Sequence, residues 1–379
     1  MAVSVAFRWP GMAGSAVKTI MQPVPGAHRE YDMPKFKILT PAGASFTVAG
    51  GGYGYEMEAL EGLDAEIVEC PATEEGFIAA AKGVDAVYAK GMKFTRPMIM
   101  ALDKCKHIAL GTVGVDYVDV AAATEKGIPV TNCPDTFIEE VADHAMMLLL
   151  AAHRRALEQD RMVREGRWSE GRPQLLQIPR LQGQTLGFIA FGRVARATAA
   201  RAKAFGLHLM AHDPFLDELS ISSHGVQPAS LSELLAKSDF VSMHLPATPE
   251  AVGFLKEHHF KQMKKNAIFI NTGRGPTVVE SGLIKALQEG WIAGAGLDVF
   301  EIEPPKPDNP LLKMSNVILA PHNASASARF DPARKRRVGQ ELALVLTGRW
   351  PMSCVNPTVL PASGLRRWQP VSMERGPNS

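Results

Sequence analysis

Short apolar runs and amphipathic stretches alternate along the first third of the chain. The runs have the length of buried strands, and the stretches between them place apolar residues at helical spacing. This rhythm is typical of an α/β domain with a parallel sheet. The predicted strands span residues 35–40, 66–69, 86–88, 108–110 and 130–132, and the predicted helices span residues 54–60, 74–81, 97–102 and 118–126.

A long helix follows, and a second alternating region comes after it. Thr136-Phe-Ile-Glu139 has the form of a capping box, and apolar residues then recur on one face as far as Arg155. We expect this helix to link two domains. Beyond a polar, arginine-rich stretch, the pattern predicts strands at residues 186–190, 207–211, 240–244, 267–270, 294–299 and 317–320, a helix capped by Ser230, and helices at 280–289 and 335–346.

The stretch from Thr185 to Phe215 has the layout of a dinucleotide-binding unit. A predicted strand ends in a tight turn at Gly192, a helix runs from there to Gly206, and a second strand closes on Asp213, 21 positions after Gly192. Unpaired N–H groups at the start of the helix would hold a pyrophosphate. Asp213 would accept hydrogen bonds from ribose hydroxyls and repel a 2′-phosphate, which favours NAD over NADP.

The glycine pattern of this unit is incomplete. Ala190 holds the first of the three usual glycine positions and Ala195 holds the third. Alanine is a common variant at the third position, but at the first a Cβ crowds the turn. We predict dinucleotide binding and leave its tightness open, with an ordinary strand-to-helix turn as the alternative.

Composition narrows the classes of partner. The 379 residues are enough for two domains, and 41 basic against 39 acidic residues give no electrostatic argument for a nucleic acid or a membrane. The basic cluster 334–337 is predicted to open a solvated helix face. The most apolar run, residues 145–152, is too short to cross a bilayer.

Four separated cysteines without CxxC spacing argue against a metal site and a disulfide framework, and they fit a reducing compartment such as the cytoplasm. They are Cys70, Cys105, Cys133 and Cys354.

The two ends of the chain differ in composition from the rest. The first acidic residue is Glu30, a composition shared by transit peptides and by untranslated leaders read in frame. Because Met33 directly precedes a convincing strand, we interpret residues 1–33 as a disordered extension or a misassigned start, with a transit peptide as the alternative. Residues 362–379 are predicted to form a disordered tail.

Three charged residues follow three successive strands of the second region, where open parallel sheets bind ligands. Arg274, held between glycines, can fork onto a carboxylate. Pairing His322 with Glu303 would favour the imidazolium, which could protonate a carbonyl oxygen as hydride reaches its carbon. Taken singly, each residue more often has a structural or surface role, and His144 and His244 are about as good on spacing alone.

The first region carries no phosphate fingerprint and is expected to supply substrate contacts. Two glycine-bearing loops, residues 89–92 and 111–116, follow its strands. Together with the second region they resemble the D-isomer-specific 2-hydroxyacid dehydrogenase family over residues 35–361. The resemblance rests on Gly111-Thr-Val-Gly-Val-Asp-Tyr-Val-Asp, Leu186-Gly-Phe-Ile-Ala-Phe-Gly-Arg-Val-Ala, His212-Asp-Pro-Phe, His244-Leu-Pro-Ala-Thr-Pro-Glu, Asn271-Thr-Gly-Arg-Gly, Gly296-Leu-Asp-Val-Phe-Glu-Ile-Glu-Pro-Pro and Ala320-Pro-His-Asn-Ala-Ser.

The resemblance implies an NAD-dependent enzyme that moves hydride between C2 of a D-2-hydroxy acid and the nicotinamide. Arg274 would bind the substrate, His322 would donate and accept the proton, and Glu303 would be the partner of His322. Implied cofactor contacts are Gly192, Arg193, Val194, Asp213, Leu245, Pro246, Thr272, Gly273 and Asp298. Implied substrate contacts are Lys90, Gly91, Val113, Gly114 and Arg274.

The family also implies two Rossmann-like domains with helices on both faces of each parallel sheet, a cleft between them, and a homodimer. The substrate domain would comprise residues 34–134 and 323–361, and the NAD-binding domain residues 135–322. The chain departs from the family pattern where Ala89-Lys90 replace an Arg-Ser pair and where Asn323 replaces an apolar residue. Lys90 would add a cation, which points to a substrate with a second anionic or polar group.

Two other functions stay open. One is an NAD-sensing dimeric interaction protein of the C-terminal-binding co-repressor type, which shares the fold and the three charged residues. The other is a dehydrogenase made slow by Ala190 and Asn323.

Overall fold

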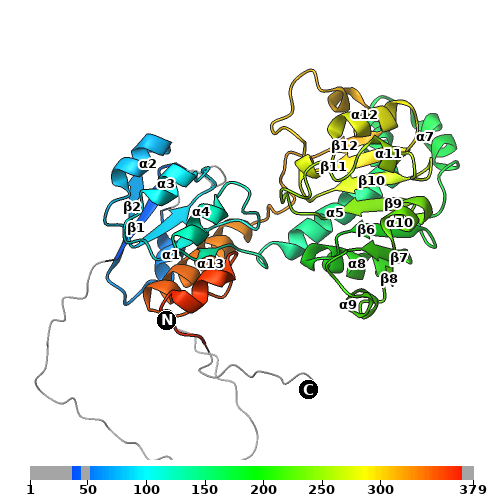
Figure 1. The fold of residues 1–379 in the computed structure, drawn as a ribbon. Coiled ribbons are helices and arrows are strands. Elements are labelled where there is room, and N and C mark those ends of the chain that lie inside the picture. The colour runs from blue at the N-terminus through cyan, green and yellow to red at the C-terminus, as the bar shows by residue number, and fades with distance from the viewer. Residues whose placement is uncertain (1–35, 44–51, 369–379) are drawn as a thin grey trace, which may run out of the picture. The chain divides into compact units, whose positions relative to one another are not determined.

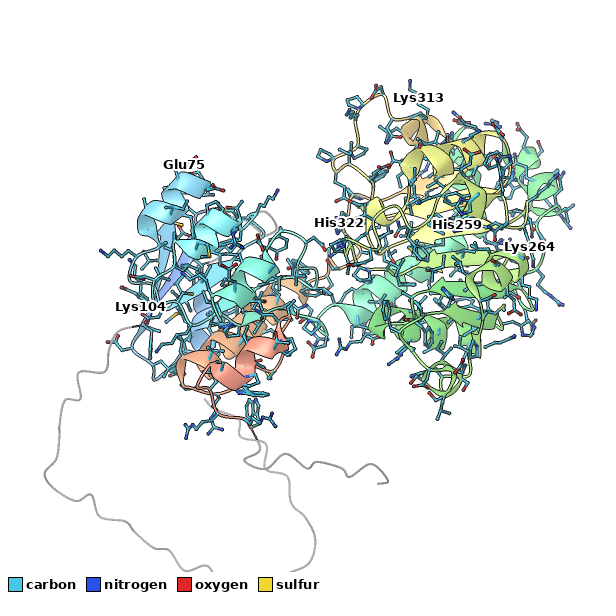
Figure 2. The ribbon with its side chains drawn as sticks, in the orientation of Figure 1. Glu75, Lys104, His259, Lys264, Lys313 and His322 are labelled. Carbon is cyan, nitrogen blue, oxygen red and sulfur yellow. The ribbon has the colours of Figure 1, made fainter. Side chains whose placement is uncertain are left out.

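The computed structural model describes residues 36–43 and 52–368, and the extension predicted for residues 1–33 lies outside these ranges. The described chain forms two α/β domains, each built on a parallel sheet with helices on both faces (Figure 1). Charged side chains such as those of Glu75 and Lys313 lie on the outside of the domains (Figure 2). The predicted fold class is confirmed.

The first sheet has five strands in the order β2-β1-β3-β4-β5. Its strands are β1 (Phe36–Pro41), β2 (Ala65–Cys70), β3 (Ala86–Ala89), β4 (Ile108–Leu110) and β5 (Val130–Thr131). One face packs on α2 (Glu74–Ala80), α3 (Arg96–Met100) and α4 (Val120–Glu125). The opposite face packs on α1 (Gly54–Glu58) and on α13 (Phe330–Leu346), which comes from the far end of the chain.

The second sheet has seven strands in the order β12-β11-β10-β9-β6-β7-β8. Because β6 lies between β7 and β9, the strand order reverses there, and open sheets bind ligands at such a reversal. The strands are β6 (Thr185–Ile189), β7 (His208–His212), β8 (Gln227–Pro228), β9 (Phe240–Met243), β10 (Ile268–Asn271), β11 (Gly294–Leu297) and β12 (Val317–Leu319).

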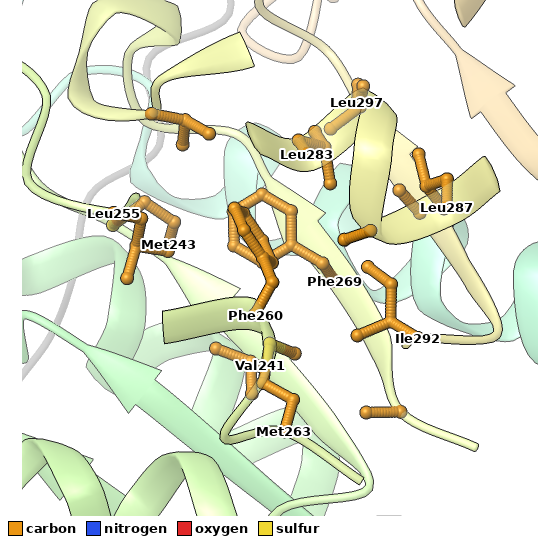
Figure 3. Close-up of a cluster of buried hydrophobic side chains, with 14 of the residues drawn as sticks. Val241, Met243, Leu255, Phe260, Met263, Phe269, Leu283, Leu287, Ile292 and Leu297 are labelled. Carbon is orange, nitrogen blue, oxygen red and sulfur yellow. The ribbon is translucent and has the colours of Figure 1, made fainter. Parts of the chain in front are cut away.

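Helices cover both faces of this sheet. One face packs on α5 (Ile138–His153), α8 (Arg193–Ala204) and α9 (Glu218–Ser222). The other packs on α10 (Leu231–Lys237), α11 (Glu257–Phe260) and α12 (Glu280–Gln288). In this second core the rings of Phe260 and Phe269 meet edge to face with centroids 5.6 Å apart (Figure 3). The core anchors β9 and β10, whose carboxyl ends carry predicted site residues.

Some helix ends differ from the sequence prediction. The capping box at Thr136 is wrong: α5 begins at Ile138 after Phe137, and no side chain caps it. The cap at Ser230 is confirmed, because its hydroxyl accepts a hydrogen bond from the Glu233 N–H at 3.2 Å. The arginine-rich stretch 161–180, for which no helix was predicted, contains α7 (Trp168–Leu175) and the end of α6 (Ala156–Arg164).

The prediction of a solvated face for the basic cluster 334–337 is wrong at two positions. Arg334 and Lys335 are 3% and 4% exposed, and both pair with Asp331 of the same helix. Arg336 behaves as predicted, because it reaches the surface and pairs with Glu58 at 2.7 Å, whereas Arg337 is partly buried and pairs with Glu341 at 2.9 Å. Helical periodicity did not reveal the burial, because α1 covers this part of α13 and is far away in the sequence.

The predicted disordered tail is also wrong in its first residues. The Arg366 N–H donates to the Gly348 carbonyl at 2.8 Å, and the Arg366 carbonyl accepts from the Trp350 N–H at 2.9 Å. The Trp368 indole N–H donates to the Trp350 carbonyl at 3.0 Å. Residues 369–379 lie outside the described ranges. Within those ranges, no helix is both long and apolar enough to cross a bilayer.

His107 gives the first domain a predictable sensitivity to acid. The residue is fully buried, its Nε2 lies 2.9 Å from the Thr131 hydroxyl, and burial lowers its pKa to about 3. An unfolded histidine has a pKa of about 6.5, so between these values the unfolded state binds more protons. The stability that this neutral histidine contributes is complete above about pH 6.5 and is lost as the pH falls toward about 3.

We therefore expect acidification from about pH 7 to about pH 5 to remove about 2 kcal/mol of unfolding free energy through His107 alone. In His107→Gln this part of the loss should disappear, because glutamine does not titrate. Denaturant unfolding of both proteins at the two pH values measures the difference. Equal acid losses in the two proteins would contradict the assignment.

Candidate functional site

Arg274 is held by its own main chain directly after β10. The Thr277 hydroxyl donates to the Arg274 carbonyl at 2.6 Å, and the Asn271 side-chain amide donates to the same carbonyl at 3.3 Å. The next residue, Gly275, leaves no room for a side chain, because a Cβ there would lie 1.7 Å from the Phe300 carbonyl oxygen. The glycine allows the close backbone approach that fixes the arginine at the carboxyl end of its strand.

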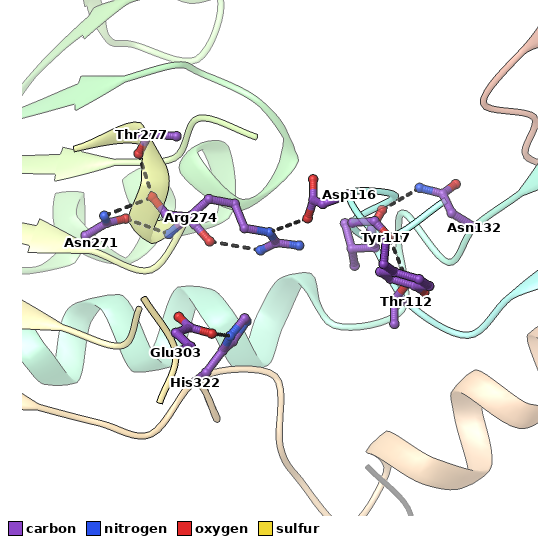
Figure 4. Close-up of polar contacts among 12 residues, drawn as sticks. Thr112, Asp116, Tyr117, Asn132, Asn271, Arg274, Thr277, Glu303 and His322 are labelled. Atoms are coloured by element: carbon purple, nitrogen blue, oxygen red, sulfur yellow. Dashed lines mark hydrogen bonds and ion pairs between the residues drawn. The ribbon is translucent and has the colours of Figure 1, made fainter. Parts of the chain in front are cut away.

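The guanidinium of Arg274 meets the loop 111–116, which follows β4 (Figure 4). Its Nε donates to the Asp116 carboxylate at 2.9 Å, and its Nη1 donates to the Gly273 carbonyl at 2.9 Å. A Cβ on Gly114 would lie 2.0 Å from Arg274 Nη2, so any side chain there would force the guanidinium to move. Sequence reasoning missed Asp116 as the partner of Arg274, since 158 positions separate the two residues.

The loop 111–116 is also tied internally and to its neighbours. The Thr112 hydroxyl donates to the Gly114 carbonyl at 2.7 Å, and it contacts the Tyr117 hydroxyl. The Asn132 side-chain amide donates to the Val113 carbonyl at 2.7 Å. These bonds hold Val113 and Gly114, both predicted substrate contacts, in one conformation.

His322 and Glu303 come together as the sequence predicts. The His322 Nδ1 lies 2.7 Å from Glu303 Oε2 (Figure 4). Burial alone would raise the pKa of Glu303, but the hydrogen bonds from His322 and Phe300 and the charges of His322 and Arg274 hold it below its usual range. Glu303 therefore stays ionised near neutral pH, and Arg274 is close enough to help keep it so. The acid–base roles of the pair remain a prediction.

Asp298 clamps the loop that carries His322. Its carbonyl accepts from the His322 N–H at 2.8 Å, and its two carboxylate oxygens accept from the Asn323 and Ala324 N–H groups at 2.9 and 3.0 Å. His322 has a φ of 50°, an unfavourable value for a side-chain-bearing residue, and the clamp holds it there. His144 Nε2 lies 3.5 Å from the Asp298 carboxylate. The family resemblance implies that Asp298 contacts the cofactor, and the structure shows in addition that Asp298 holds the His322 loop.

The dinucleotide unit has the geometry of an anion site. Gly192 caps α8 without a side-chain hydrogen bond, and a Cβ built on it would meet nothing within 4 Å. Gly192 and Arg193 are exposed, so the first N–H groups of α8 face open space. Asp213, at the end of β7, accepts from the Phe191 N–H at 2.9 Å, which ties the carboxylate to the glycine turn.

The other predicted cofactor contacts also lie at carboxyl ends of strands. Leu245 and Pro246 follow β9, whereas Thr272 and Gly273 follow β10. The Thr272 hydroxyl is buried and has no hydrogen-bond partner among the described residues. A buried hydroxyl without a partner is costly unless a ligand or water completes it. These residues therefore fit a bound nicotinamide dinucleotide.

Ala190 adopts the left-handed conformation that the usual glycine would adopt, with a φ of 65°. This conformation costs a residue with a Cβ about 1–2 kcal/mol. Glycine removes that strain, but part of the gain in stability is lost because glycine makes the unfolded chain more flexible. We expect Ala190→Gly to increase the free energy of unfolding by about 0.5 kcal/mol and so to raise the thermal midpoint of unfolding. Ala195→Gly, inside α8, is the control and should lower the midpoint. A lower midpoint for Ala190→Gly than for the wild type would contradict the strain.

Lys90, predicted to contact substrate, shares its charge with protein groups. It follows β3, its side chain is 11% exposed, and its Nζ lies 3.4 Å from a Glu69 carboxylate oxygen. The ammonium also donates to the Tyr53 hydroxyl. Burial lowers the pKa of Lys90 although the charge of Glu69 opposes this. The lysine is therefore not the unpaired cation that the sequence led us to expect.

The alternative histidines have structural surroundings. Burial lowers the pKa of His244 to about 4, and its Nε2 lies 2.9 Å from the Ser242 hydroxyl. His144 faces the Asp298 carboxylate, which holds the His322 loop. No group of three or more His, Cys, Asp or Glu side chains in residues 36–43 and 52–368 could hold a metal ion.

The chain is similar in sequence and in fold to known proteins. Residues 146–324 match the family model described as D-isomer specific 2-hydroxyacid dehydrogenase, NAD binding domain. The glyoxylate reductase of Korarchaeum cryptofilum is 42% identical over 303 residues, which are 79% of this chain and 90% of that protein. The D-3-phosphoglycerate dehydrogenase of Methanocaldococcus jannaschii is 37% identical over 316 residues, which are 83% of this chain and 60% of that protein.

A solved structure gives the same result. The NADPH-dependent glyoxylate/hydroxypyruvate reductase of Sinorhizobium meliloti, in complex with NADP and malonate, is 32% identical with a TM-score of 0.72. The match covers 89% of this chain and 100% of the solved chain.

Proposed function

Because the chain belongs to the D-isomer-specific 2-hydroxyacid dehydrogenase family, we propose that it interconverts a D-2-hydroxy acid and its 2-oxo acid with NAD. It is an oxidoreductase acting on CH–OH groups, and its cofactor is a nicotinamide dinucleotide. The observation that carries the finer proposal is the His322–Glu303 contact of 2.7 Å within reach of the charge of Arg274. An acid–base pair and a carboxylate-binding cation are what this reaction requires of the protein.

The three residues divide the work by position. When bound, the nicotinamide supplies or accepts the hydride. Arg274 keeps Nη2 free of protein hydrogen bonds within the described chain and can donate from it to the substrate carboxylate. His322 holds Glu303 through Nδ1 and can use Nε2 to protonate the carbonyl oxygen in reduction or to take the hydroxyl proton in oxidation. Glu303, being ionised, stabilises the imidazolium.

The cofactor would lie along the second sheet at its order reversal. Gly192, Arg193 and Val194 would hold the pyrophosphate, and Asp213 would hold the adenosine ribose. We expect NADH to bind about a hundredfold more tightly than NADPH, because a 2′-phosphate would meet the Asp213 carboxylate. Fluorescence titration with both cofactors tests this. In Asp213→Ala the preference should narrow, and a wild type that prefers NADPH would refute the choice of NAD.

We propose a small 2-oxo acid of the glyoxylate or hydroxypyruvate type as substrate. Lys90 is engaged by Glu69 and Tyr53, which leaves it a weak receptor for a phosphate group. The similarity to the glyoxylate reductase of Korarchaeum cryptofilum, at 42% identity, supports this choice.

We further propose that residues 34–134 and 323–361 bind substrate, that residues 135–322 bind NAD, and that two chains form a dimer through the second domain. The proposed dimer is supported by a group of exposed apolar side chains on or beside α6 and α7. The group comprises Leu157, Val163, Trp168 and Leu176. Light scattering should give the mass of two chains, and Trp168→Glu should lower the mass toward that of one chain.

Three buried free cysteines, Cys70, Cys105 and Cys133, support a reducing compartment such as the cytoplasm.

A turnover screen tests the main proposal. NADH oxidation is measured with glyoxylate, hydroxypyruvate, pyruvate and 3-phosphohydroxypyruvate. We expect the first two to give the highest kcat/KM. If NADH binds and none of the acids is reduced, the enzyme proposal fails and the cofactor-sensing interaction protein becomes the better explanation.

A further inference from the structure

Four buried polar atoms on the face of the first sheet that packs on α1 and α13 have no hydrogen-bond partner among residues 36–43 and 52–368. They are the Tyr88 hydroxyl, both carboxylate oxygens of Glu56, and the Nε of Arg334. Tyr88 and Glu56 are 0% exposed, and Arg334 is 3% exposed. A buried polar atom without a partner costs about 1–3 kcal/mol, so this concentration needs an explanation.

The three side chains act on one another electrostatically. Burial raises the pKa of Tyr88, so its hydroxyl keeps its proton, and the charges of Arg334 and Glu56 act on it in opposite directions. Burial also raises the pKa of Glu56, and the charges of Lys335 and Arg334 oppose it. Tyr88, Glu56 and Arg334 therefore form one group, which we call the Tyr88 cluster.

The Tyr88 cluster reaches the main chain of Gly111. A Cβ built on Gly111 would lie 3.2 Å from Arg334 Nη1 and 3.3 Å from the Tyr88 hydroxyl oxygen. Both distances are tight for a Cβ, so the two polar groups form a floor directly beneath this glycine. Gly111 is buried, and it is the first residue after β4.

The contacts of Arg334 and the packing of α1 on α13 restrict the movement of these two polar groups. Arg334 donates through Nη2 to Asp331 of its own helix, and its guanidinium lies 5.3 Å from the centre of the Phe330 ring. Helix α1 presses on α13 so closely that a Cβ on Gly339 would lie 2.2 Å from the Glu56 carbonyl oxygen. With this packing, Arg334 and Tyr88 have little freedom to follow a movement of Gly111.

Above the floor, Gly111 begins the loop 111–116. This loop carries Gly114 against Arg274 and bonds Asp116 to the same guanidinium. Because Thr112 and Asn132 fix the loop internally, a displacement at Gly111 is passed on to the residues that face the substrate. Losses of about 1 Å in such positioning are enough to weaken turnover.

We propose that Tyr88 and Arg334 are positioning residues, which set the height of the loop 111–116 and thereby the fit of the 2-oxo acid. The proposal rests on the proposed function. It explains why a hydroxyl without a partner is kept in the core: a phenylalanine would be cheaper to bury, but it would leave an atom-sized gap beneath Gly111.

The experiment uses two single variants and their combination in the full chain. Tyr88→Phe removes only the hydroxyl, whereas Gly111→Ala adds a methyl against the same floor. Each should raise KM for the best 2-oxo acid about fivefold, with kcat and the NADH dissociation constant within about twofold of the wild type. The thermal midpoint of Tyr88→Phe should be unchanged or higher, since no hydrogen bond is lost.

The double variant is the decisive measurement. Removing the hydroxyl makes room for the added methyl, so its KM should rise less than the product of the two single effects. Gly54→Ala is the matched control, because a Cβ there meets nothing within 4 Å, and its KM should not change. An unchanged KM in both single variants, or strictly multiplicative effects, would overturn the proposal. If the wild type reduces no 2-oxo acid, the proposed function fails first and this inference falls with it.

Discussion

Arg274→Lys is expected to lower kcat/KM for the 2-oxo acid by about a thousandfold, a loss of about 4 kcal/mol in transition-state stabilisation. Lysine keeps the charge, but it carries one compact ammonium in place of a planar fork. In the structure the guanidinium uses separate nitrogens for Asp116 and for the Gly273 carbonyl, and its third nitrogen lies against Gly114. An ammonium cannot satisfy these partners and the substrate carboxylate together, so both orientation and binding are lost.

The measurement is steady-state kinetics together with NADH binding. NADH affinity should change by less than about threefold, because the variant leaves the glycine turn and Asp213 intact. Arg336→Lys is a matched control, since Arg336 lies on the surface, pairs with Glu58 and stacks on Tyr55. A kcat/KM for Arg274→Lys within tenfold of the wild type would remove Arg274 from the substrate site.

The sequence was sufficient to predict most strands of the two sheets and which strand ends carry the candidate residues, but it missed β8, α6 and α7. Short apolar runs predicted β6 and β10 to within one residue, because a parallel strand buried on both faces is built mainly from apolar residues. The same logic brought His322 and Glu303 together, since both follow strands at the same edge of one sheet. These predictions depend on local pattern and on topology, which sequence expresses directly.

Apart from the His322–Glu303 pair, the sequence did not predict which charged residues pair with each other. Arg334 and Lys335 look like surface residues in a helical pattern, and only the packing of α1 on α13 buries them. Asp116 looks like a loop carboxylate until the fold places it against Arg274. Lys90 does follow β3, but the sequence did not show that Glu69 pairs with its charge and so makes it a weaker receptor for a substrate anion. Which charges pair is decided by tertiary contacts between distant segments, and a single sequence does not record those contacts.

His322→Gln is expected to lower kcat by about a thousandfold in both directions, because general acid–base groups contribute about 10²–10⁴ and glutamine neither gives nor takes a proton. NADH binding should be retained, since the Asp298 clamp holds the loop through main-chain N–H groups. Glu303→Gln should cost less, about a hundredfold, because it removes the stabiliser and leaves the proton carrier.

The two variants can be tested against each other. Because His322 and Glu303 act as a unit, the double variant should be no slower than His322→Gln by more than about threefold. His208→Gln, an exposed histidine at the start of β7, is the control for the substitution itself. Multiplicative losses in the double variant would mean that the 2.7 Å contact between the two side chains has no part in the reaction, and that Glu303 acts elsewhere.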